Sequence, residues 1–161
     1  MPAPEPPPVT DPIPIQCSPL SASERPLLNK FYKSQASSMR GSDSGVAWVA
    51  RAGTIVAALN LSPVPGGYWL TGLLVAEDWR WQQVARRLIE RASQDAAGCV
   101  WLFCHPDLRT FYERLGYAVS EDLPAVLAER LARYRRSKPL LAMARHQSSA
   151  AGSSPGNSTS V

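Results

Sequence analysis

The hydrophobic pattern of this chain changes period near its middle, and that change restricts the possible fold more than any other feature. Apolar residues follow a period of two up to Ala76, as in strands, and then recur at Val84 and Leu88, as along one helix face. The continuous apolar run Cys99–Cys104 comes next and is typical of a buried central strand. A strand, a helix and a buried strand in this order predict a β-α-β crossover, and therefore a mixed α/β fold.

Turn and capping signals place further elements on both sides of that crossover. Ala52-Gly53 and the cluster Pro63–Gly67 are turn signals that separate three strands of an antiparallel series. Ser21 and Glu24 have the spacing of a capping box, which starts a helix. We expect helices that open at Ser21, at Val84, at Pro106 and at Pro124, and strands over 13–17, 46–51, 54–61, 68–76, 99–104, 117–119 and 138–144.

Composition separates one folded region from two ends. Five prolines in residues 1–11 predict an extended arm, and the uncharged, serine-rich residues 147–161 predict a disordered tail. Residues 12–146 are then one domain, as a chain of 161 residues allows. No apolar stretch approaches a membrane span, no signal peptide is evident, and three scattered cysteines make no disulfide framework. A cytoplasmic protein without a membrane partner is the expectation.

The charge of the folded region is positive. Residues 12–146 hold all 17 basic residues and 11 of the 13 acidic ones, which gives a net charge of +6. The densest basic cluster lies over residues 130–138. A basic surface suggests an anionic ligand or partner, but nucleic-acid binding needs a stacking surface or a recognised motif as well. A solvated helix face is the simpler interpretation, and nucleic acid is the less favoured partner.

The segment 73–88 is the best candidate for a binding site. An apolar strand runs into a turn that carries Arg80, and an amphipathic helix follows at once. A helix N-terminus leaves backbone N–H groups unpaired and carries partial positive charge, so it suits a phosphate. Arg80 adds a fixed charge. Metal binding is not expected, because Cys99, Cys104 and His105 lack zinc spacing.

Two segments carry motifs that belong together. Residues 80–85 read Arg-Trp-Gln-Gln-Val-Ala, and residues 111–117 read Phe-Tyr-Glu-Arg-Leu-Gly-Tyr. The first resembles the acyl-CoA pyrophosphate loop of the GNAT superfamily of N-acyltransferases, Gln/Arg-x-x-Gly-x-Gly/Ala, with Gln83 in place of the middle glycine. The second is similar to that family's Phe-Tyr-Glu-Lys-Leu-Gly-Phe signature, with His105 where an Asn often precedes it. The resemblance spans about residues 13–145 and is strongest over 68–117.

This resemblance implies a fold and a coenzyme site. The fold would be a mostly antiparallel sheet with splayed central strands and flanking helices. The pantetheine arm of acetyl-CoA would lie between strands 68–76 and 99–104, and backbone N–H groups of residues 81–85 would hold the pyrophosphate. A helical backbone at Gln83 would leave its N–H free, and another conformation would weaken coenzyme affinity. The implied coenzyme-binding residues are Leu73, Leu74, Val75, Arg80, Trp81, Gln82, Gln83, Val84, Ala85 and His105, the last of which is alternatively a helix cap.

The same resemblance implies a reaction. An acetyl group would pass from acetyl-CoA to an amine of a small molecule or a protein, by direct attack in a ternary complex. Tyr112 matches the general acid, and a phenol with a pKa near about 10 is protonated at neutral pH, ready to protonate the departing thiolate. Phe31, Tyr32, Ser38 and Arg40 are in range of the acceptor.

Two alternatives stay open at this point, together with a possible homodimer. Gln83 and the lack of Asp, Glu or His in residues 66–76 suit a module that binds acyl-CoA without catalysis. The basic cluster suits a protein that binds an acidic partner or nucleic acid. Strand 138–144, if it lies at a free edge of the sheet, could pair with a second copy.

Overall fold

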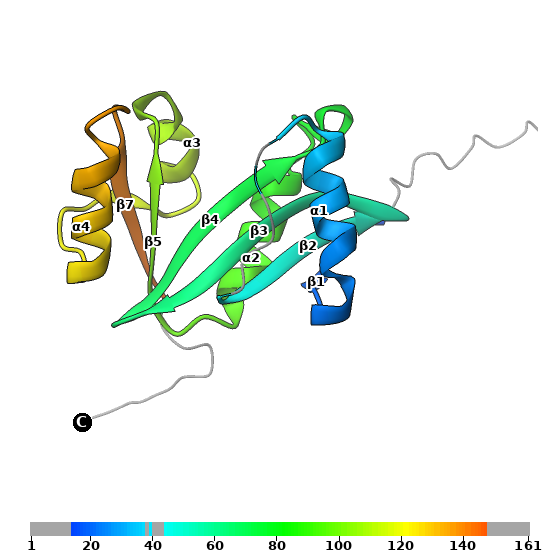
Figure 1. Cartoon of the computed structure of the whole chain (residues 1–161), viewed down its shortest axis with the longest axis horizontal. Helices are drawn as coiled ribbons and strands as arrows, with labels where there is room; N and C mark the ends of the chain where they lie inside the picture. Colours follow the sequence, from blue (N-terminus) through cyan, green and yellow to red (C-terminus); the bar gives the residue numbers. More distant parts are fainter. Residues whose placement is uncertain (1–13, 38, 40–43, 148–161) are drawn as a thin grey trace, which may run out of the picture.

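A seven-stranded sheet runs through the part of the chain that the computed structural model describes, residues 14–37, 39 and 44–147 (Figure 1). The strand order is β1-β2-β3-β4-β5-β7-β6. Within these residues every neighbouring pair is antiparallel except β4 and β5, which are parallel. The predicted mixed α/β fold and its order of elements are therefore confirmed. The strands are β1 (Gln16–Pro19), β2 (Val46–Ala52), β3 (Thr54–Val64), β4 (Gly67–Val75), β5 (Gly98–Cys104), β6 (Ala118–Val119) and β7 (Leu141–Gln147).

Helices cover both faces of the sheet. The core under α2 contains Ala57 and Leu59, whereas the core under α1 contains Ala58 from between them, so α1 and α2 lie on opposite faces. Figure 1 shows α1 and α4 standing at opposite ends of one face, with α2 behind the sheet. The helices are α1 (Arg25–Ser34), α2 (Val84–Gln94), α3 (Arg109–Glu113) and α4 (Ala125–Tyr134), and the 3-10 turns η1 (Ala22–Glu24), η2 (Glu77–Trp79) and η3 (Pro106–Leu108) precede the first three.

The two central strands β4 and β5 separate along their length. They pair only at Gly67–Cys99, Tyr68–Val100 and Trp69–Trp101, while β5 continues to pair with β7 up to Cys104. At the closed end the backbones come very close, because a Cβ atom on Gly67 would collide with the Cys99 carbonyl. The splayed central strands predicted from the family resemblance are therefore present.

A bulge interrupts β4 just beyond the point of separation. Ala58 pairs with Leu74 and Asn60 pairs with Thr71, so two residues of β4 lie opposite Leu59. Gly72 is one of them and has a φ of +67°, a conformation that glycine adopts without strain. The Tyr32 hydroxyl of α1 donates to the Gly72 carbonyl at 2.7 Å. Burial raises the pKa of Tyr32 to about 12, so α1 holds the bulge with a neutral donor.

Several boundary predictions need correction. The capping box at Ser21 and Glu24 is confirmed, but the first strand is Gln16–Pro19. Strand β3 continues through Pro63 because the two-residue turn Pro65-Gly66 keeps the hairpin paired up to Val64 and Gly67. Pro14 and Ile15 lie before β1, and Ile13 lies outside the described residues.

The last strand also begins later than predicted, and its position in the sheet removes the free edge on which the possible homodimer was based. Backbone turns at Ser137 and Lys138 extend the end of α4, so β7 begins at Leu141 and reaches Gln147, the first residue of the expected tail. The predicted free edge is wrong, because β7 lies between β5 and β6. The expected arm over 1–11 and the rest of the expected tail fall outside the described residues.

Candidate functional site

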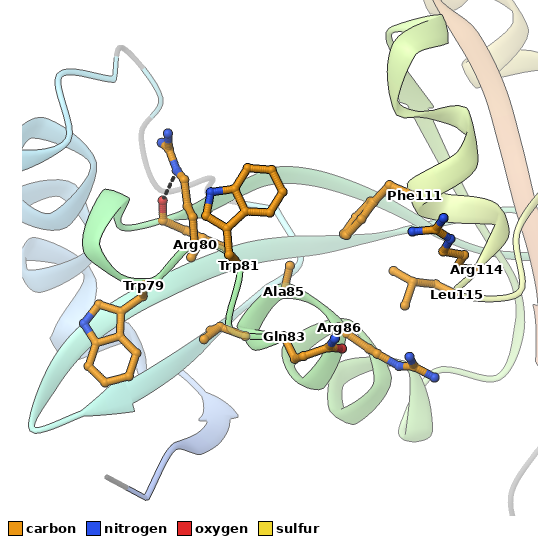
Figure 2. Close-up of a pocket in the computed structure, with 11 residues that line it drawn as sticks. Trp79, Arg80, Trp81, Gln83, Ala85, Arg86, Phe111, Arg114 and Leu115 are labelled. Carbon is orange, nitrogen blue, oxygen red and sulfur yellow. Dashed lines mark hydrogen bonds between the residues drawn. The ribbon is translucent and has the colours of Figure 1, made fainter. Parts of the chain in front are cut away.

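A cleft of about 430 Å³ opens where β4 and β5 diverge. Its near wall is the connection between β4 and α2 with the first turn of α2, and its far wall is α3 with the two residues that follow it (Figure 2). Val75, at the end of β4, lines the cleft and none of the β5 residues does, so the cleft lies beside the pantetheine gap that the sequence analysis placed between strands 68–76 and 99–104. The residues that line it are Val75, Trp79, Arg80, Trp81, Gln83, Val84, Ala85, Arg86, Phe111, Arg114 and Leu115.

The near wall has an unusual backbone. Trp81 and Gln83 have φ values of +70° and +66°, a left-handed conformation that costs a non-glycine residue about 1–2 kcal/mol. Gln83 directly precedes α2, and its side chain makes no capping bond to the helix. The first N–H groups of α2 consequently lack both an intrahelical partner and a side-chain cap. Left-handed residues alternating along a turn aim successive N–H groups into one concave surface, which suits an anion.

The conformation of Gln83 decides a point that the sequence left conditional. Its backbone is left-handed and not helical, which is the case for which the sequence analysis predicted weaker coenzyme affinity. A glycine would reach this φ without strain, so the loop keeps a shape suited to glycine although the residue is Gln.

Three arginines give the cleft a positive charge. Arg80, Arg86 and Arg114 all line it. The Arg80 Nε donates to the Val75 carbonyl at 3.2 Å, which ties the side chain back to the end of β4 (Figure 2). Arg86 also contacts Glu90 through an Nε–Oε2 distance of 3.4 Å, one turn along α2. A cleft with this charge favours an anionic ligand.

The far wall consists of residues that the sequence analysis quoted but gave no role. Phe111, Arg114 and Leu115 have the i, i+3, i+4 spacing of one helix face. Figure 2 shows Phe111 opposite Trp81 across the cleft, and the Trp81 side chain is 99% exposed. The spacing within the second motif was the signal that would have identified this wall.

Tyr112 lies beside this wall rather than on it. Its side chain is only 6% exposed, and its ring meets the Tyr117 ring edge-on with centroids 5.9 Å apart. Burial raises the pKa of Tyr112 above its usual range, and interactions with Cys104 and Tyr117 add to that rise. The hydroxyl is therefore neutral at physiological pH and lies near Cys104, at the end of β5 that diverges from β4.

The remaining predicted residues lie around the cleft or outside it. Leu73 lies in the bulge of β4 and Leu74 follows it, and the two side chains pack into the cores on opposite faces of the sheet. Gln82 donates from Nε2 to the Asp78 carbonyl at 3.2 Å, within the turn. His105 caps η3, because its Nδ1 accepts from the Asp107 N–H at 3.0 Å.

The expected acceptor residues are only partly described. Phe31 and Tyr32 are buried in α1, and Ser38 and Arg40 fall outside the described residues. In the described part of the chain, no three His, Cys, Asp or Glu side chains gather as metal ligands would. Over the same residues, no helix has the length and apolar character of a membrane span.

Known proteins share both a sequence family and a fold with this chain. The family model of the acetyltransferase (GNAT) domain matches residues 43–119. No curated protein sequence matches the chain. A ribosomal-protein-S18-alanine N-acetyltransferase from Escherichia coli is similar in structure, with a TM-score of 0.61 and 17% identity over 86% of this chain and 96% of that one.

Two further solved structures have the same architecture. A GNAT acetyltransferase from Staphylococcus aureus Mu50 has a TM-score of 0.59 at 14% identity and covers 83% of this chain and 99% of its own. An aminoglycoside 6'-N-acetyltransferase complexed with coenzyme A has a TM-score of 0.57 at 16% identity and covers 81% of this chain and 96% of its own. The family match over residues 43–119 and the shared fold together support the assignment of the chain as a member of the GNAT superfamily of acetyltransferases.

Proposed function

We propose that this protein transfers an acetyl group from acetyl-CoA to an amine acceptor. The observation that carries the proposal is the cleft itself, which lies at the end of β4 and is lined by the uncapped turn before α2 and by three arginines. The edge of β4 that leads to it is not paired with β5 beyond Trp69. A ligand that fits such a cleft is elongated, carries amide groups along its length and is strongly anionic at one end. Acetyl-CoA has this form.

The residues present fit the coenzyme in three ways. The edge of β4 beyond Trp69 is not paired with β5, so its backbone can pair with the amides of the pantetheine arm around Leu73 and Val75. The N–H groups of residues 81–85 suit the pyrophosphate, and Arg80, Arg86 and Arg114 supply the opposite charge. Phe111 and Leu115 give the cleft an apolar side.

The reaction that we propose is a direct transfer. The amine nitrogen attacks the thioester carbonyl carbon, a C–N bond forms and the C–S bond breaks. Tyr112 donates its hydroxyl proton to the departing thiolate sulfur, the nitrogen releases its extra proton to solvent, and the Tyr112 phenolate takes a proton back from solvent. The role of Tyr112 depends on a protonated phenol, which its raised pKa maintains at neutral pH.

A second candidate function is an acyl-CoA-binding module without catalysis. The burial of Tyr112 and its absence from the lining of the cleft favour it, because a general acid must reach the reacting sulfur. The two functions share the coenzyme site and differ in turnover. Coenzyme binding and amine acetylation therefore have to be measured separately.

The test is thermal melting of the purified protein alone, with CoA and with acetyl-CoA, followed by an amine acetylation assay. A ligand that binds the native state at 100 times its Kd adds about 2.7 kcal/mol to the free energy of unfolding, so the Tm must rise. Arg80→Ala should reduce that rise, whereas Arg136→Ala, outside the cleft, should leave it unchanged. No rise in the native protein contradicts both candidates, and a rise without turnover on any amine supports the binding module.

A further inference from the structure

One face of the sheet has no helix over its centre. Figure 1 shows the middle of the sheet open between α1 and α4 on this side. Asn60 of β3, Trp69 of β4 and Phe103 of β5 lie on this face. Their placement follows from the pleat, since Leu59 and Leu70 point into the core under α2 and their neighbours point the other way. We call this surface, defined by Asn60, Thr71, Trp69, Phe103 and the flank of α4, the acceptor face.

Two buried polar atoms on the acceptor face have no hydrogen-bond partner among the described residues. They are the Asn60 Oδ1, an acceptor, and the Trp69 Nε1, a donor. The Asn60 side chain is 6% exposed, and its Nδ2 donates to the Ser62 Oγ at 2.9 Å. Asn60 pairs with Thr71 and Ser62 pairs with Trp69, so Asn60 and Trp69 are diagonal neighbours, about 7–8 Å apart. Buried polar groups normally have partners, so a ligand with an N–H group and an oxygen suits this pair.

The α4 end of the acceptor face is aromatic and basic. The Arg130 guanidinium lies over the Trp69 ring, 5.0 Å from its centroid, and Phe103 packs between Trp69 and Tyr134. Arg130, Arg133 and Tyr134 have the i, i+3, i+4 spacing of one flank of α4. Within the described part of the chain, neither Arg130 nor Arg133 forms an ion pair with an acidic side chain, so both arginines can bind an anion. The basic cluster that the sequence analysis left unexplained thus borders the acceptor face.

The chemistry of β4 selects the kind of amine. Strand β4 contains no Asp, Glu or His that could remove a proton from an incoming ammonium group. A peptide α-amine has a pKa of about 8, whereas a lysine amine has a pKa of about 10.4, so only the α-amine is substantially neutral near pH 7.5 without a base. The positive charge of the neighbouring arginines favours the neutral form further.

We infer that the acceptor is the N-terminus of an extended peptide with an acidic side chain near its third or fourth residue. This inference rests on the proposed acetyl transfer. The peptide runs along the acceptor face from the bulge at Gly72, where the strands diverge, towards Trp69 and α4. Three residues of strand span about 10 Å, which is also the reach of three extended peptide residues. The acidic side chain then meets Arg130 and Arg133, and backbone groups pair with Asn60 and Trp69.

A nucleic acid would need a different surface. Bases bind single-stranded sites by stacking on open aromatic faces. Here Arg130 covers one face of the Trp69 ring, and the Phe103 ring lies between Trp69 and Tyr134. The faces of these aromatic rings are therefore not open for a base to stack on, which favours a peptide ligand over a nucleic acid.

The experiment measures direct binding and acetylation of matched hexapeptides with free N-termini. One peptide has Glu at positions three and four, a second has Gln there and a third has Lys. Binding is measured by calorimetry on the complex with CoA, and acetylation as kcat/KM with acetyl-CoA. We expect a preference for the Glu peptide of about fivefold or more over the Gln peptide, as one or two ion pairs supply.

Three variants test the individual contacts of the acceptor face. Arg133→Glu should abolish the preference for the Glu peptide, and the charge-matched Arg136→Glu, beyond the end of α4, should retain it. Trp69→Phe keeps an aromatic side chain, although a smaller one, and removes the unpaired donor, so it should weaken peptide binding without lowering the Tm. A purely structural role for Trp69 would lower the Tm and leave peptide affinity unchanged.

The results that would overturn the peptide inference differ from those that would overturn the proposed acetyl transfer. Equal binding of the three peptides, or a preference for Lys, overturns the inference even if amines are acetylated. Displacement of the Glu peptide by single-stranded RNA, lost in Arg133→Glu, overturns it in favour of a nucleic-acid partner. If the coenzyme fails to raise the Tm, the proposed acetyl transfer fails, while calorimetry on the free protein still shows whether the acceptor face binds acidic peptides.

Discussion

The connections that follow β4 and β5 lie at the same end of these two central strands and contain the same kinds of element, but they differ in backbone strain and in helix capping. Strand β4 passes through η2 into α2, and strand β5 passes through η3 into α3. The first contains two left-handed non-glycine residues and no side-chain cap, and its Trp81 is almost wholly exposed. The second has a side-chain cap, His105, followed by Pro106 at the first position of the turn.

The β5–α3 connection stabilises the fold, whereas the β4–α2 connection keeps polar groups available for a ligand. In the β5–α3 connection, the cap satisfies a backbone donor and the proline fixes the turn. In the β4–α2 connection, strain and unpaired N–H groups remain, as is usual for functional sites. We therefore expect the first connection to determine coenzyme affinity, and the second to position the helix that carries Tyr112.

The largest expected effect is on turnover and comes from the second connection's helix. Tyr112→Phe should lower kcat about 100-fold, because general acid catalysis typically contributes that much or more. The Kd for acetyl-CoA, measured by calorimetry, should stay within a factor of about two, because Tyr112 does not line the cleft. Unchanged kcat would remove Tyr112 from the mechanism, and a large loss of coenzyme affinity would contradict the division between the two connections.

The pH profile of acetyl transfer by the unmutated protein tests the same residue. Burial stabilises the neutral phenol of Tyr112 and so raises its pKa, which keeps the proton donor present as the pH rises. With a peptide acceptor, kcat/KM should rise as the amine loses its proton and then stay level up to pH of about 10, the usual tyrosine pKa. A descending limb between pH of about 8 and 9 that Tyr112→Phe removes would show that the phenol is not held neutral.

An intermediate effect is expected from relieving strain in the first connection. Gln83→Gly should raise the free energy of unfolding by about 0.5–1 kcal/mol, because glycine adopts a positive φ without the penalty that other residues incur. The matched control is Gln82→Gly, one residue earlier, where φ is not positive and glycine should destabilise the protein. Chemical denaturation of both variants is the measurement, and equal destabilisation by the two glycines would disprove the strain at Gln83.

The smallest effect is expected at the cap of the second connection. His105→Ala should lower the free energy of unfolding by about 0.5–1 kcal/mol, the usual loss for a side-chain cap, with the Kd for coenzyme unchanged. The sequence also allowed His105 to contact the coenzyme. A severalfold weaker affinity for CoA in this variant, measured by calorimetry, would favour that contact over the capping role alone.

The sequence predicted the order of elements well because each signal is local. The capping box at Ser21, the turn at Gly53 and the 3.6-residue period after Val84 depend on neighbours in the chain, and all three elements are present. The position of β7 inside the sheet could not be predicted, because it depends on β6 pairing with it from 24 or more positions earlier in the chain. Strand order is a property of such distant pairs.

For the candidate site too, the sequence predicted the parts that depend on neighbouring residues and not those that depend on distant ones. Most residues of the first motif line the cleft, because they follow one another in a single turn. The left-handed backbone at Trp81 and Gln83 contradicts the ordinary preference of both residues, so no propensity could indicate it. The acceptor face combines side chains from β3, β4, β5 and α4, and only the register of the sheet shows that Asn60 and Trp69 are neighbours.

The close contact between Gly67 and Cys99 lies at the end where β4 and β5 are still paired. The backbones of the two parts of the sheet, β1–β4 and β5–β7–β6, pair there over three residue pairs, and a common core under α2 joins the two parts beyond that point. An added methyl group at Gly67 would act as a wedge against the Cys99 carbonyl. We therefore expect a residue larger than glycine at position 67 to push β4 and β5 apart and so to change the width of the cleft, although Gly67 does not line it.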